Sequence, residues 1–418
     1  MAVVCSRPFC LMSQIERMEA PLAGSEVPLS HFPLPIHCFG ITRVADLTEL
    51  DVIGIPVWSA MRPNARGLSV SQGKGLNHEQ ARISAIMESI EGAVAEQTRT
   101  LVSAFGSVGQ MQAKGRRLID LQGMVRCRKG QLDQSRERAW VRGFDYRTRE
   151  EIFAPYELVG MDMRVNFPWD SLAFHVSSVG LAAGLDFSFA ASRALLEAIE
   201  HDAVALIHTF GLKSSSIQPL SYQAGLHRSL DEAVCKIRHA GLTPYFFHVP
   251  NRVGVPTIAA AISRPVLGLR GAGERLSGGY ASRLDPYEAA LSAILEAVQS
   301  RLTNIAGARD DMDPAQYEAD KIVSLACHDG RPLSSLASRT NRTPLSSEAT
   351  LEFLAGLLHE AGQDEIGIFP LPTPLKDVHV VRVLVPGLRT EVEGDLMRIH
   401  VSDLLSAVSP KIAENATP

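Results

Sequence analysis

The feature that most constrains this chain is a single pattern that occurs three times, with copies about a hundred residues apart. In each copy a leucine and a helix-capping residue come before a helix-forming stretch, and a glutamate stands twelve positions after the leucine. The leucine and glutamate pairs are Leu76 with Glu88, Leu185 with Glu197, and Leu284 with Glu296. A constant interval of this kind indicates that one structural unit is used three times.

Each copy is predicted to be an amphipathic helix. In the first copy, apolar residues follow the three-and-four spacing of a buried helical stripe. They are Ile83, Ile86, Met87 and Ile90. The residues expected to cap the three helices are Asn77, Asp186 and Asp285. In the last copy, Pro286 and Glu288 also predict a proline in the first turn and a capping box.

Every copy also carries two acidic or amide side chains three positions apart, which project from the same side of a helix. If the three helices pack around a common centre, five carboxylates meet there: Glu88, Glu91, Glu197, Glu200 and Glu296. Carboxylates held this close repel one another, so they need cations or take up protons. Oxygen ligands suit Mg²⁺, which commonly bridges carboxylates to substrate phosphates. The alternative interpretation is that each copy is only a solvated amphipathic helix.

Composition excludes several classes of protein. The chain has 418 residues and 45% hydrophobic content, which allows a large core in one to three domains. The net charge of −5 gives no support for nucleic-acid binding. Six cysteines without a CxxC pair argue against a zinc ribbon and fit a reducing compartment. No stretch approaches the roughly eighteen apolar residues of a membrane span, so we expect a cytoplasmic protein without membrane contact.

Helical and strand patterns alternate along the chain, which predicts an α/β or α+β fold. Residues 1–30 are predicted to be a poorly ordered tail, residues 31–410 a single domain, and residues 411–418 a C-terminal tail.

Three further segments have clear patterns. We expect buried strands at Thr257–Ile262 and Val378–Val385, and an amphipathic helix over Leu351–Ala361 that Gly362 ends. An arginine-rich run over residues 115–142 is either a solvated face or a docking surface for an acidic peptide.

Familiar nucleotide and hydrolase signatures are missing. Gly73-Lys74-Gly75 lacks the rest of a P-loop, and Gly271-Ala272-Gly273 lacks the third glycine of a dinucleotide fingerprint. The chain also has no HExxH or GxSxG motif. A nucleotide would therefore be bound through carboxylates and metal. Lys74 is either a point charge for a phosphate or a simple turn residue.

Several short motifs occur in one fixed order between about residues 45 and 390. They are 51–57 (DVIGIPV), Arg62-Pro63-Asn64, 71–76 (SQGKGL), the helix with Ser84, Glu88 and Glu91, 178–184 (SVGLAAG), Glu197-Ala198-Ile199-Glu200, 299–303 (QSRLT), Arg309-Asp310-Asp311 and 385–388 (VPGL). Together these motifs resemble those of the YcaO-domain family. The resemblance implies a YcaO-type fold for residues 31–410, built from three related α/β units around a central carboxylate-rich nucleotide site.

The resemblance implies an ATP- and Mg²⁺-dependent enzyme that modifies the backbone of a ribosomally synthesised peptide. In the family, an amide oxygen attacks the γ-phosphate, and a nucleophile then displaces the phosphorylated oxygen. A neighbouring Cys, Ser or Thr gives an azoline, whereas external sulfide gives a thioamide. The implied partners are a precursor peptide, a TfuA-like or leader-binding protein, and a second copy of the chain in a homodimer.

The resemblance also implies roles for individual residues. The implied metal ligands are Glu88, Glu91, Glu197, Glu200 and Glu296. The implied catalytic residues are Glu197, Glu200 and Arg301. The implied nucleotide-binding residues are Lys74, Ser84, Glu88, Gln299 and Arg309. Of these, Gln299, Arg301 and Arg309 are expected near the phosphates.

Five positions depart from the usual family pattern. Val179 and Leu185 replace asparagines, Phe189 replaces a metal-binding glutamate, and Gly92 and His201 replace arginines. These changes favour an alternative hypothesis, a catalytically lapsed relative that binds peptides or activates a partner. A third hypothesis is a carboxylate-metal hydrolase that needs no nucleotide. The sequence ends Asn415-Ala416-Thr417-Pro418, without the Pro-x-Pro-x-Pro tail of many azoline-forming members, which favours a thioamide product.

Overall fold

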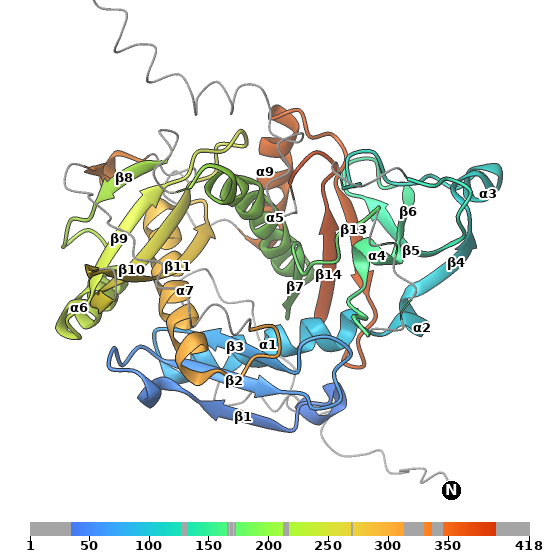
Figure 1. The fold of residues 1–418 in the computed structure, drawn as a ribbon. Helices are drawn as coiled ribbons and strands as arrows, with labels where there is room; N and C mark the ends of the chain where they lie inside the picture. Colours follow the sequence, from blue (N-terminus) through green and yellow to red (C-terminus); the bar gives the residue numbers. More distant parts are fainter. Residues whose placement is uncertain are drawn as a thin grey trace, which may run out of the picture.

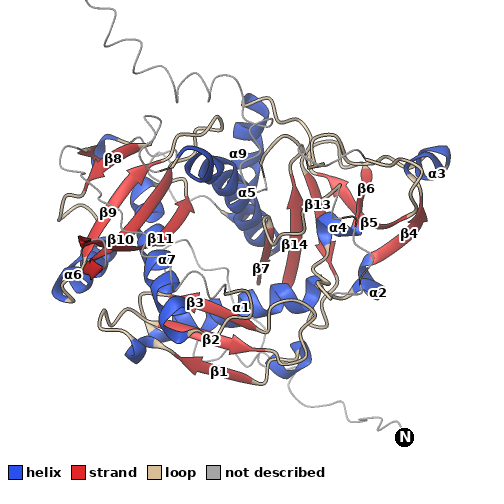
Figure 2. Ribbon diagram, viewed as in Figure 1, coloured by secondary structure: helices blue, strands red, loops and turns tan. Residues whose placement is uncertain are grey.

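The computed structural model describes residues 35–126, 132–164, 167, 170, 173–211, 217–268, 271–312, 330–336 and 346–389. The tails predicted at residues 1–30 and 411–418 lie outside this part of the chain. Within it, the predicted mixed α/β class is confirmed: three sheets are arranged around the long helices (Figures 1 and 2).

The three sheets differ in size. The first has the order β1-β2-β3, with β1 (Arg43–Asp46), β2 (Val57–Met61) and β3 (Val70–Lys74). The second has the order β11-β10-β9-β8-β12, with β8 (Gln218–Ser221), β9 (Thr243–His248), β10 (Thr257–Gly268), β11 (Gly271–Ser282) and β12 (Arg331–Pro332). The third has the order β4-β5-β13-β14-β7, with β6 beside β5; its strands are β4 (Val102–Gly106), β5 (Arg138–Asp145), β6 (Glu151–Pro155), β7 (Leu181–Gly184), β13 (Gly367–Leu371) and β14 (His379–Leu384).

The described helices are of two kinds. The longer ones are α1 (His78–Ala95), α5 (Phe187–Phe210), α6 (Arg228–His239), α7 (Pro286–Ala306) and α9 (Ser347–Glu360). The short ones are α2 (Thr98–Leu101), α3 (Val108–Ala113), α4 (Tyr156–Val159) and the 3₁₀ helices η2 (Ile36–Phe39), η3 (Thr48–Leu50) and η4 (Leu333–Ser335). No described helix is long and apolar enough to cross a membrane.

The threefold sequence pattern corresponds to three strand-helix units, one from each sheet. Helix α1 follows β3, α5 follows β7 and α7 follows β11. Each helix also packs against the strand of another unit: α1 contacts β7, α5 contacts β11 and α7 contacts β3. The three units therefore close into a ring, with the acidic helices around the middle of the molecule (Figure 1).

The predicted N-caps begin the three helices. The side chain of Asn77 accepts a hydrogen bond from Gln80 N at 2.9 Å, and that of Asp186 accepts one from Phe189 N at 2.7 Å. Asp285 accepts from two backbone N–H groups at the start of α7. The predicted capping box in this last copy is wrong, because Oε1 of Glu288 lies 3.0 Å from Nε2 of His227 instead of bonding to the cap backbone.

Glycines let the acidic helices approach their strands closely. A Cβ atom at Gly73 of β3 would lie 2.0 Å from the backbone N of Ala85 in α1. A Cβ atom at Gly279 of β11 would lie 2.3 Å from the backbone O of Ala293 in α7. Any side chain at either position would push the helix away from its sheet.

The predicted apolar stripe of α1 is divided between two environments. Ile86 and Ile90 are buried in the core, as expected. Ile83 and Met87 are partly exposed and line a central cavity instead, because this edge of the helix faces the middle of the ring.

Other predicted elements agree with the structure. The Val378–Val385 pattern contains β14, which pairs with β13 on one side and β7 on the other. The Leu351–Ala361 pattern lies in α9 up to residue 360, and Gly362 follows with a φ of 79°. The Thr257–Ile262 pattern forms the buried first half of β10.

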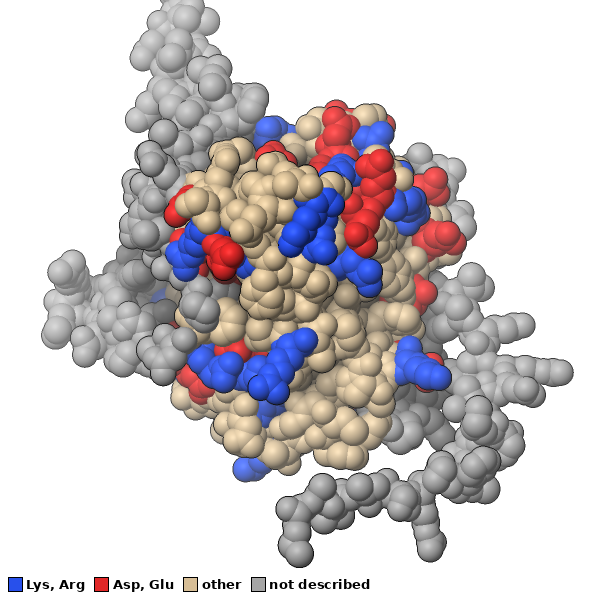
Figure 3. Space-filling model, turned by 90° about the vertical axis from the view of Figure 1, so that its right-hand side faces the viewer, with Lys and Arg blue, Asp and Glu red and all other residues tan. Residues whose placement is uncertain are grey.

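Described members of the arginine-rich run form ion pairs with the chain's own acids. Arg117 contacts Asp145 at 3.1 Å, and also contacts Glu150 and Glu365. Arg138 is buried and contacts Asp170 at 2.6 Å. Figure 3 shows basic and acidic side chains next to one another on the face of the molecule seen there. The described part of this run therefore gives no support to a docking surface for an acidic peptide.

Candidate active site

The acidic side chains of the three helices meet at one cavity of about 700 Å³. Helix α1 contributes Glu88 and Glu91, α5 contributes Glu197 and Glu200, and α7 contributes Glu296. The sequence pattern predicted this convergence, and the structure brings all five carboxylates together. Solvated helices with unrelated acidic faces would not share a cavity, so that alternative is wrong.

Backbone N–H groups of neighbouring units hold the carboxylates in place. Glu91 of α1 accepts a hydrogen bond from Ala183 N on β7 at 2.8 Å, and Glu200 of α5 accepts one from Ser282 N on β11 at 2.9 Å. Glu296 of α7 accepts from the backbone of β11. The bonds to Glu91 and Glu200 each leave one carboxylate oxygen available to the cavity, whereas the second oxygen of Glu296 contacts Lys74 Nζ at 3.0 Å.

The negative charges of these carboxylates raise one another's pKa values. Burial and the neighbouring Glu88 raise the pKa of Glu91 to about 8, and burial together with Glu296 raises the pKa of Glu200 to about 7. Burial also raises the pKa of Glu197 well above its usual value, and Glu91 and Glu200 add to this effect. Such a set is stable at neutral pH only with bound protons or cations.

The donor set fits magnesium ions that are shared with a ligand. All five acidic donors are oxygens, the ligand type that Mg²⁺ prefers. Among the described residues, no group of three or more His, Cys, Asp or Glu side chains is already arranged to hold a metal ion. Mg²⁺ usually takes one or two carboxylates together with waters and substrate phosphates, and paired carboxylates around an open cavity suit that arrangement.

Several cations also line the cavity. Lys74 lies 3.0 Å from Glu296, and Arg309 forms an ion pair with Asp311 at 2.7 Å. Burial and the nearby Arg193 lower the pKa of Arg283 to about 9. Positive groups beside acidic groups allow the cavity to bind a metal–phosphate ligand through both parts.

Position in the repeat also identifies cavity residues that the motifs had not assigned. Ser84, Arg193 and Ser292 each stand four residues before the first glutamate of their copy, and all three line the cavity. Only Ser84 was predicted. Extending the register to the other two copies would have identified Arg193 and Ser292.

Gln299 and Arg301 do not line the cavity. Arg301 forms a two-bond ion pair with Asp51, at 2.9 and 3.0 Å, and its side chain is 14% exposed. It stands five residues after Glu296, about 140° around the helix, and therefore points away from the acidic side. The Gln299 amide donates to the Gln72 carbonyl of β3 at 3.2 Å, a bond that a carboxylate could not make.

Three of the five positions that depart from the family pattern, Gly92, Phe189 and His201, line the cavity, whereas Val179 and Leu185 do not. Phe189 is 48% exposed and lines it, and so does His201, whose Nε2 lies 4.0 Å from Glu197 Oε1. Burial lowers the pKa of His201, so the imidazole is neutral at pH 7. At Gly92 the available space is taken by Arg62, whose Nη2 would lie 2.8 Å from a Cβ atom there.

Comparisons with known proteins identify the family. The family model described as YcaO cyclodehydratase, ATP- and Mg²⁺-binding, matches residues 72–389. An uncharacterised protein from the tfuA 3′ region of Rhizobium leguminosarum bv. trifolii is 37% identical over 373 residues, which cover 86% of each chain.

Solved structures share the fold. The YcaO structure from Methanopyrus kandleri, bound with AMPPCP and Mg²⁺, is similar with a TM-score of 0.64 and 23% identity, over 87% of this chain and 90% of that one. The microcin synthetase McbBCD complex of E. coli contains a chain with a TM-score of 0.59 and 16% identity, over 84% of this chain and 90% of that one. With its ordered motifs, its ring of acidic helices and a family match over most of its length, this chain belongs to the YcaO family of ATP- and Mg²⁺-binding proteins.

Proposed function

We propose that this protein uses ATP and Mg²⁺ to activate a peptide backbone amide and replace its oxygen with a nucleophile. The observation that carries the proposal is the single cavity in which five carboxylates and at least two cations face one another. A nucleotide's phosphates and their metal ions would complete both sets of charges.

The proposed reaction has two stages. The amide oxygen attacks the γ-phosphorus of ATP, and the bond to ADP breaks. The nucleophile then adds to the amide carbon, and the original oxygen leaves as inorganic phosphate. With sulfide the product is a thioamide; with a neighbouring Cys, Ser or Thr side chain it is an azoline. Mg²⁺ would neutralise charge on the phosphates while the phosphoryl group moves.

The residues have distinct parts in this proposal. Glu88, Glu91, Glu197, Glu200 and Glu296 would hold the magnesium ions through the oxygens that their backbone contacts leave available. Ser84, Lys74 and Arg309 would bind the nucleotide. We assign Gln299 and Arg301 positioning roles, because Gln299 fixes α7 to β3 and Arg301 fixes it to Asp51 before β2.

The nature of the relatives favours a thioamide product made with a TfuA-like partner. A relative that shares 37% identity is named for its place in a tfuA 3′ region. A partner encoded nearby would deliver sulfide or the peptide. The McbBCD complex shows that a chain of this fold assembles with other proteins, but those partners belong to that system.

The test combines this chain, the TfuA-like protein and the precursor peptide encoded with it, in the presence of Mg-ATP and sulfide. We expect phosphate release together with a peptide mass that reports exchange of one oxygen for sulfur. Loss of one water instead would indicate an azoline. Glu197→Gln should stop both signals, whereas Glu232→Gln on the exposed face of α6 should change neither. Phosphate release that survives Glu197→Gln would contradict the assignment of this cavity.

A second candidate function is a catalytically lapsed scaffold that binds peptides or activates a partner without turnover. The specific observation in its favour is Phe189, an exposed apolar side chain in the cavity where the family pattern has a metal ligand. The two candidates differ in one measurement. The scaffold predicts no phosphate release from ATP, even when the partner and peptide are present.

A further inference from the structure

A second cavity of about 570 Å³ adjoins the carboxylate cavity. It lies between the end of η2, the loop after β2, the C-terminal end of α1 with α2, and the loop after β13. The two cavities share two lining residues, Arg62 and Glu96. One ion pair therefore forms part of the wall between them.

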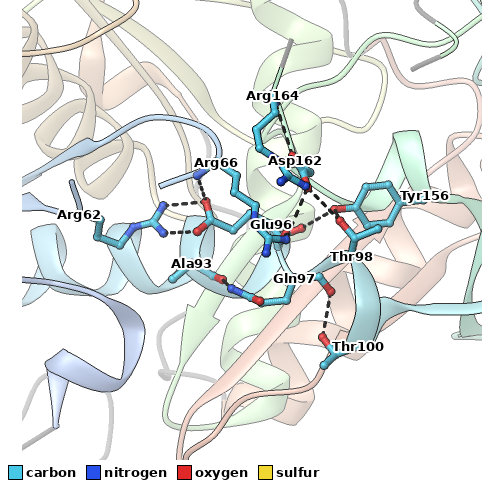
Figure 4. A network of polar contacts seen from close by, with 11 residues as sticks. Arg62, Arg66, Ala93, Glu96, Gln97, Thr98, Thr100, Tyr156, Asp162 and Arg164 are labelled. Atoms are coloured by element: carbon cyan, nitrogen blue, oxygen red, sulfur yellow. Dashed lines mark hydrogen bonds and ion pairs between the residues drawn. The ribbon is translucent and has the colours of Figure 1, made fainter. Parts of the chain in front are cut away.

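This dividing ion pair is buried. Arg62 Nη1 lies 2.8 Å from Glu96 Oε1 and Nη2 lies 3.4 Å from Oε2, and the two side chains are 5% and 7% exposed. Figure 4 shows the guanidinium of Arg62 facing the carboxylate of Glu96 end to end. Because each charge is neutralised by the other, the pair presents no net charge to either cavity.

Further contacts hold the pair in place. The backbone N of Arg66 donates to Glu96 Oε2 at 2.9 Å, and the Arg66 guanidinium donates to the Glu96 carbonyl, also at 2.9 Å. Arg66 lies 3.5 Å from the fully buried Asp162, which accepts a hydrogen bond from Thr98 (Figure 4). A divider fixed to three separate segments keeps the two cavities distinct.

Among the described residues, no other charged side chain lines the second cavity. Its polar groups are neutral: Cys38, Asn64, Gln97, Thr100 and Thr373. Its remaining lining is apolar, glycine or proline. Such a surface offers no counter-charge for a metal ion or a phosphate. Gln97 already donates to the Ala93 carbonyl and Thr100 to the Gln97 carbonyl, so their side-chain oxygens are acceptors for the N–H groups of an uncharged peptide, and the Asn64 amide can both donate and accept.

The dividing pair also has an unused donor. Nε of Arg62 is buried and has no hydrogen-bond partner among the residues that the structure describes, and the residue is only 4% exposed. A buried donor without an acceptor destabilises the protein. A carbonyl oxygen that enters beside Arg62 would supply the missing acceptor after a small shift of the side chain.

We propose that the second cavity binds an uncharged segment of the peptide substrate, next to the amide that reacts in the carboxylate cavity. The inference rests on the proposed function, in which one backbone amide must reach the nucleotide while the rest of the peptide lies elsewhere. The segment would pass along the Arg62–Glu96 divider, with its neighbouring residues held by Asn64 and Gln97. Peptides with acidic or basic residues in this segment are excluded, since nothing in the lining compensates their charge.

Two exposed cysteines make the inference testable without a known substrate. Cys38 lines the second cavity, whereas Cys235 lies on α6, away from both cavities. The experiment uses the full chain with Cys5, Cys10, Cys127 and Cys327 changed to Ser. The protein is equilibrated, without nucleotide, with thiol probes that form reversible disulfides. Mass spectrometry then compares the amount of probe attached at Cys38 with the amount attached at Cys235.

The probes are acetylated, amidated tetrapeptides with one Cys and three residues chosen from Gly, Ala, Ser and Asn. Matched peptides carry two Asp or two Lys, and mercaptoethanol is the blank. At Cys38 we expect the yield of disulfide with the neutral peptides to exceed the yields with mercaptoethanol and with the charged peptides by about tenfold. This is the effect of one or two net hydrogen bonds. At Cys235 the neutral peptides should exceed the blank by no more than about twofold. Asn64→Ala should reduce the preference at Cys38.

Two results would overturn the inference. One is an equal yield of neutral peptide and blank at Cys38, or a preference there for the Asp peptides. The other is a tethered neutral peptide that weakens binding of AMPPCP and Mg²⁺ by about tenfold, which would make the second cavity part of the nucleotide's own space. Both readouts are independent of turnover, so an inactive enzyme would contradict the proposed function without deciding this point.

Discussion

Binding of Mg²⁺ and nucleotide should release protons from the carboxylate ring, and the structure gives the number. With pKa values of about 8 for Glu91 and about 7 for Glu200, the free protein at pH 7 holds about nine-tenths of a proton on the first and about half on the second. Metal ions require the ionised carboxylates, so binding should displace roughly one to one and a half protons from these two groups.

Calorimetry measures this quantity directly. Binding of AMPPCP with Mg²⁺ is recorded at pH 7 in several buffers with different ionisation enthalpies, and the dependence of the heat on that enthalpy gives the number of protons released. The share released by Glu91 and Glu200 should fall towards zero at about pH 9, where both are already ionised, and affinity should rise between pH 6 and 8. Glu232→Gln serves as the control, because this exposed glutamate lies outside the cavity.

The decisive variant is Glu91→Gln. The amide oxygen of Gln can still accept the hydrogen bond from Ala183 N, so the ring should keep its shape. The variant should bind more weakly and release close to one proton fewer than the parent. Proton release that is absent at pH 7, or that is the same in Glu91→Gln, would refute the view that these carboxylates are held protonated until metal arrives.

Three other predictions concern stability. Gly73→Ala should lower the free energy of unfolding by about 3 kcal/mol or more, because the new Cβ meets the backbone of α1. The control Gly109→Ala, at the open start of α3, should raise it by about 0.5–1 kcal/mol. Chemical denaturation measures both values. Glu96→Gln leaves the charge of Arg62 buried without its partner and should lower the free energy of unfolding by about 3–5 kcal/mol. The double variant Glu96→Gln with Arg62→Met removes that charge and should recover most of the loss. Because the pKa of Glu91 is raised from 4.5 to about 8, this side chain's contribution to the stability of the metal-free protein should be complete below about pH 4.5 and be lost as the pH rises to about 8. Over this range the free energy of unfolding should fall less in Glu91→Gln than in the parent, and an equal fall in both proteins would contradict the assignment.

The parts of this structure that depend on local sequence were predictable. Capping side chains act within three residues, so Asn77, Asp186 and Asp285 could be recognised directly. The convergence of the carboxylates followed from repetition, because three copies of one unit tend to place equivalent side chains around one axis. The family then followed from the order of the motifs.

Contacts between distant segments account for the rest. Arg62 and Glu96 pair across 34 positions, and Arg301 and Asp51 across 250, and neither spacing carries a signal in a single sequence. Arg301 was expected near the phosphates, but its position on α7 directs its side chain away from the side of the helix that carries Glu296. The arginine-rich run suggested a basic surface only because its acidic partners, such as Glu365, lie far away in the chain.

The cyclic order of the three units determines when a growing chain can acquire its site. The first unit needs β7 to anchor Glu91, the second needs β11 to anchor Glu200, and the last helix returns to β3 through Gln299. Strand β7 is itself paired with β14, which ends at Leu384. Synthesis must therefore pass residue 384 before the acidic pocket is complete, and shorter chains would lack the proposed ATP site.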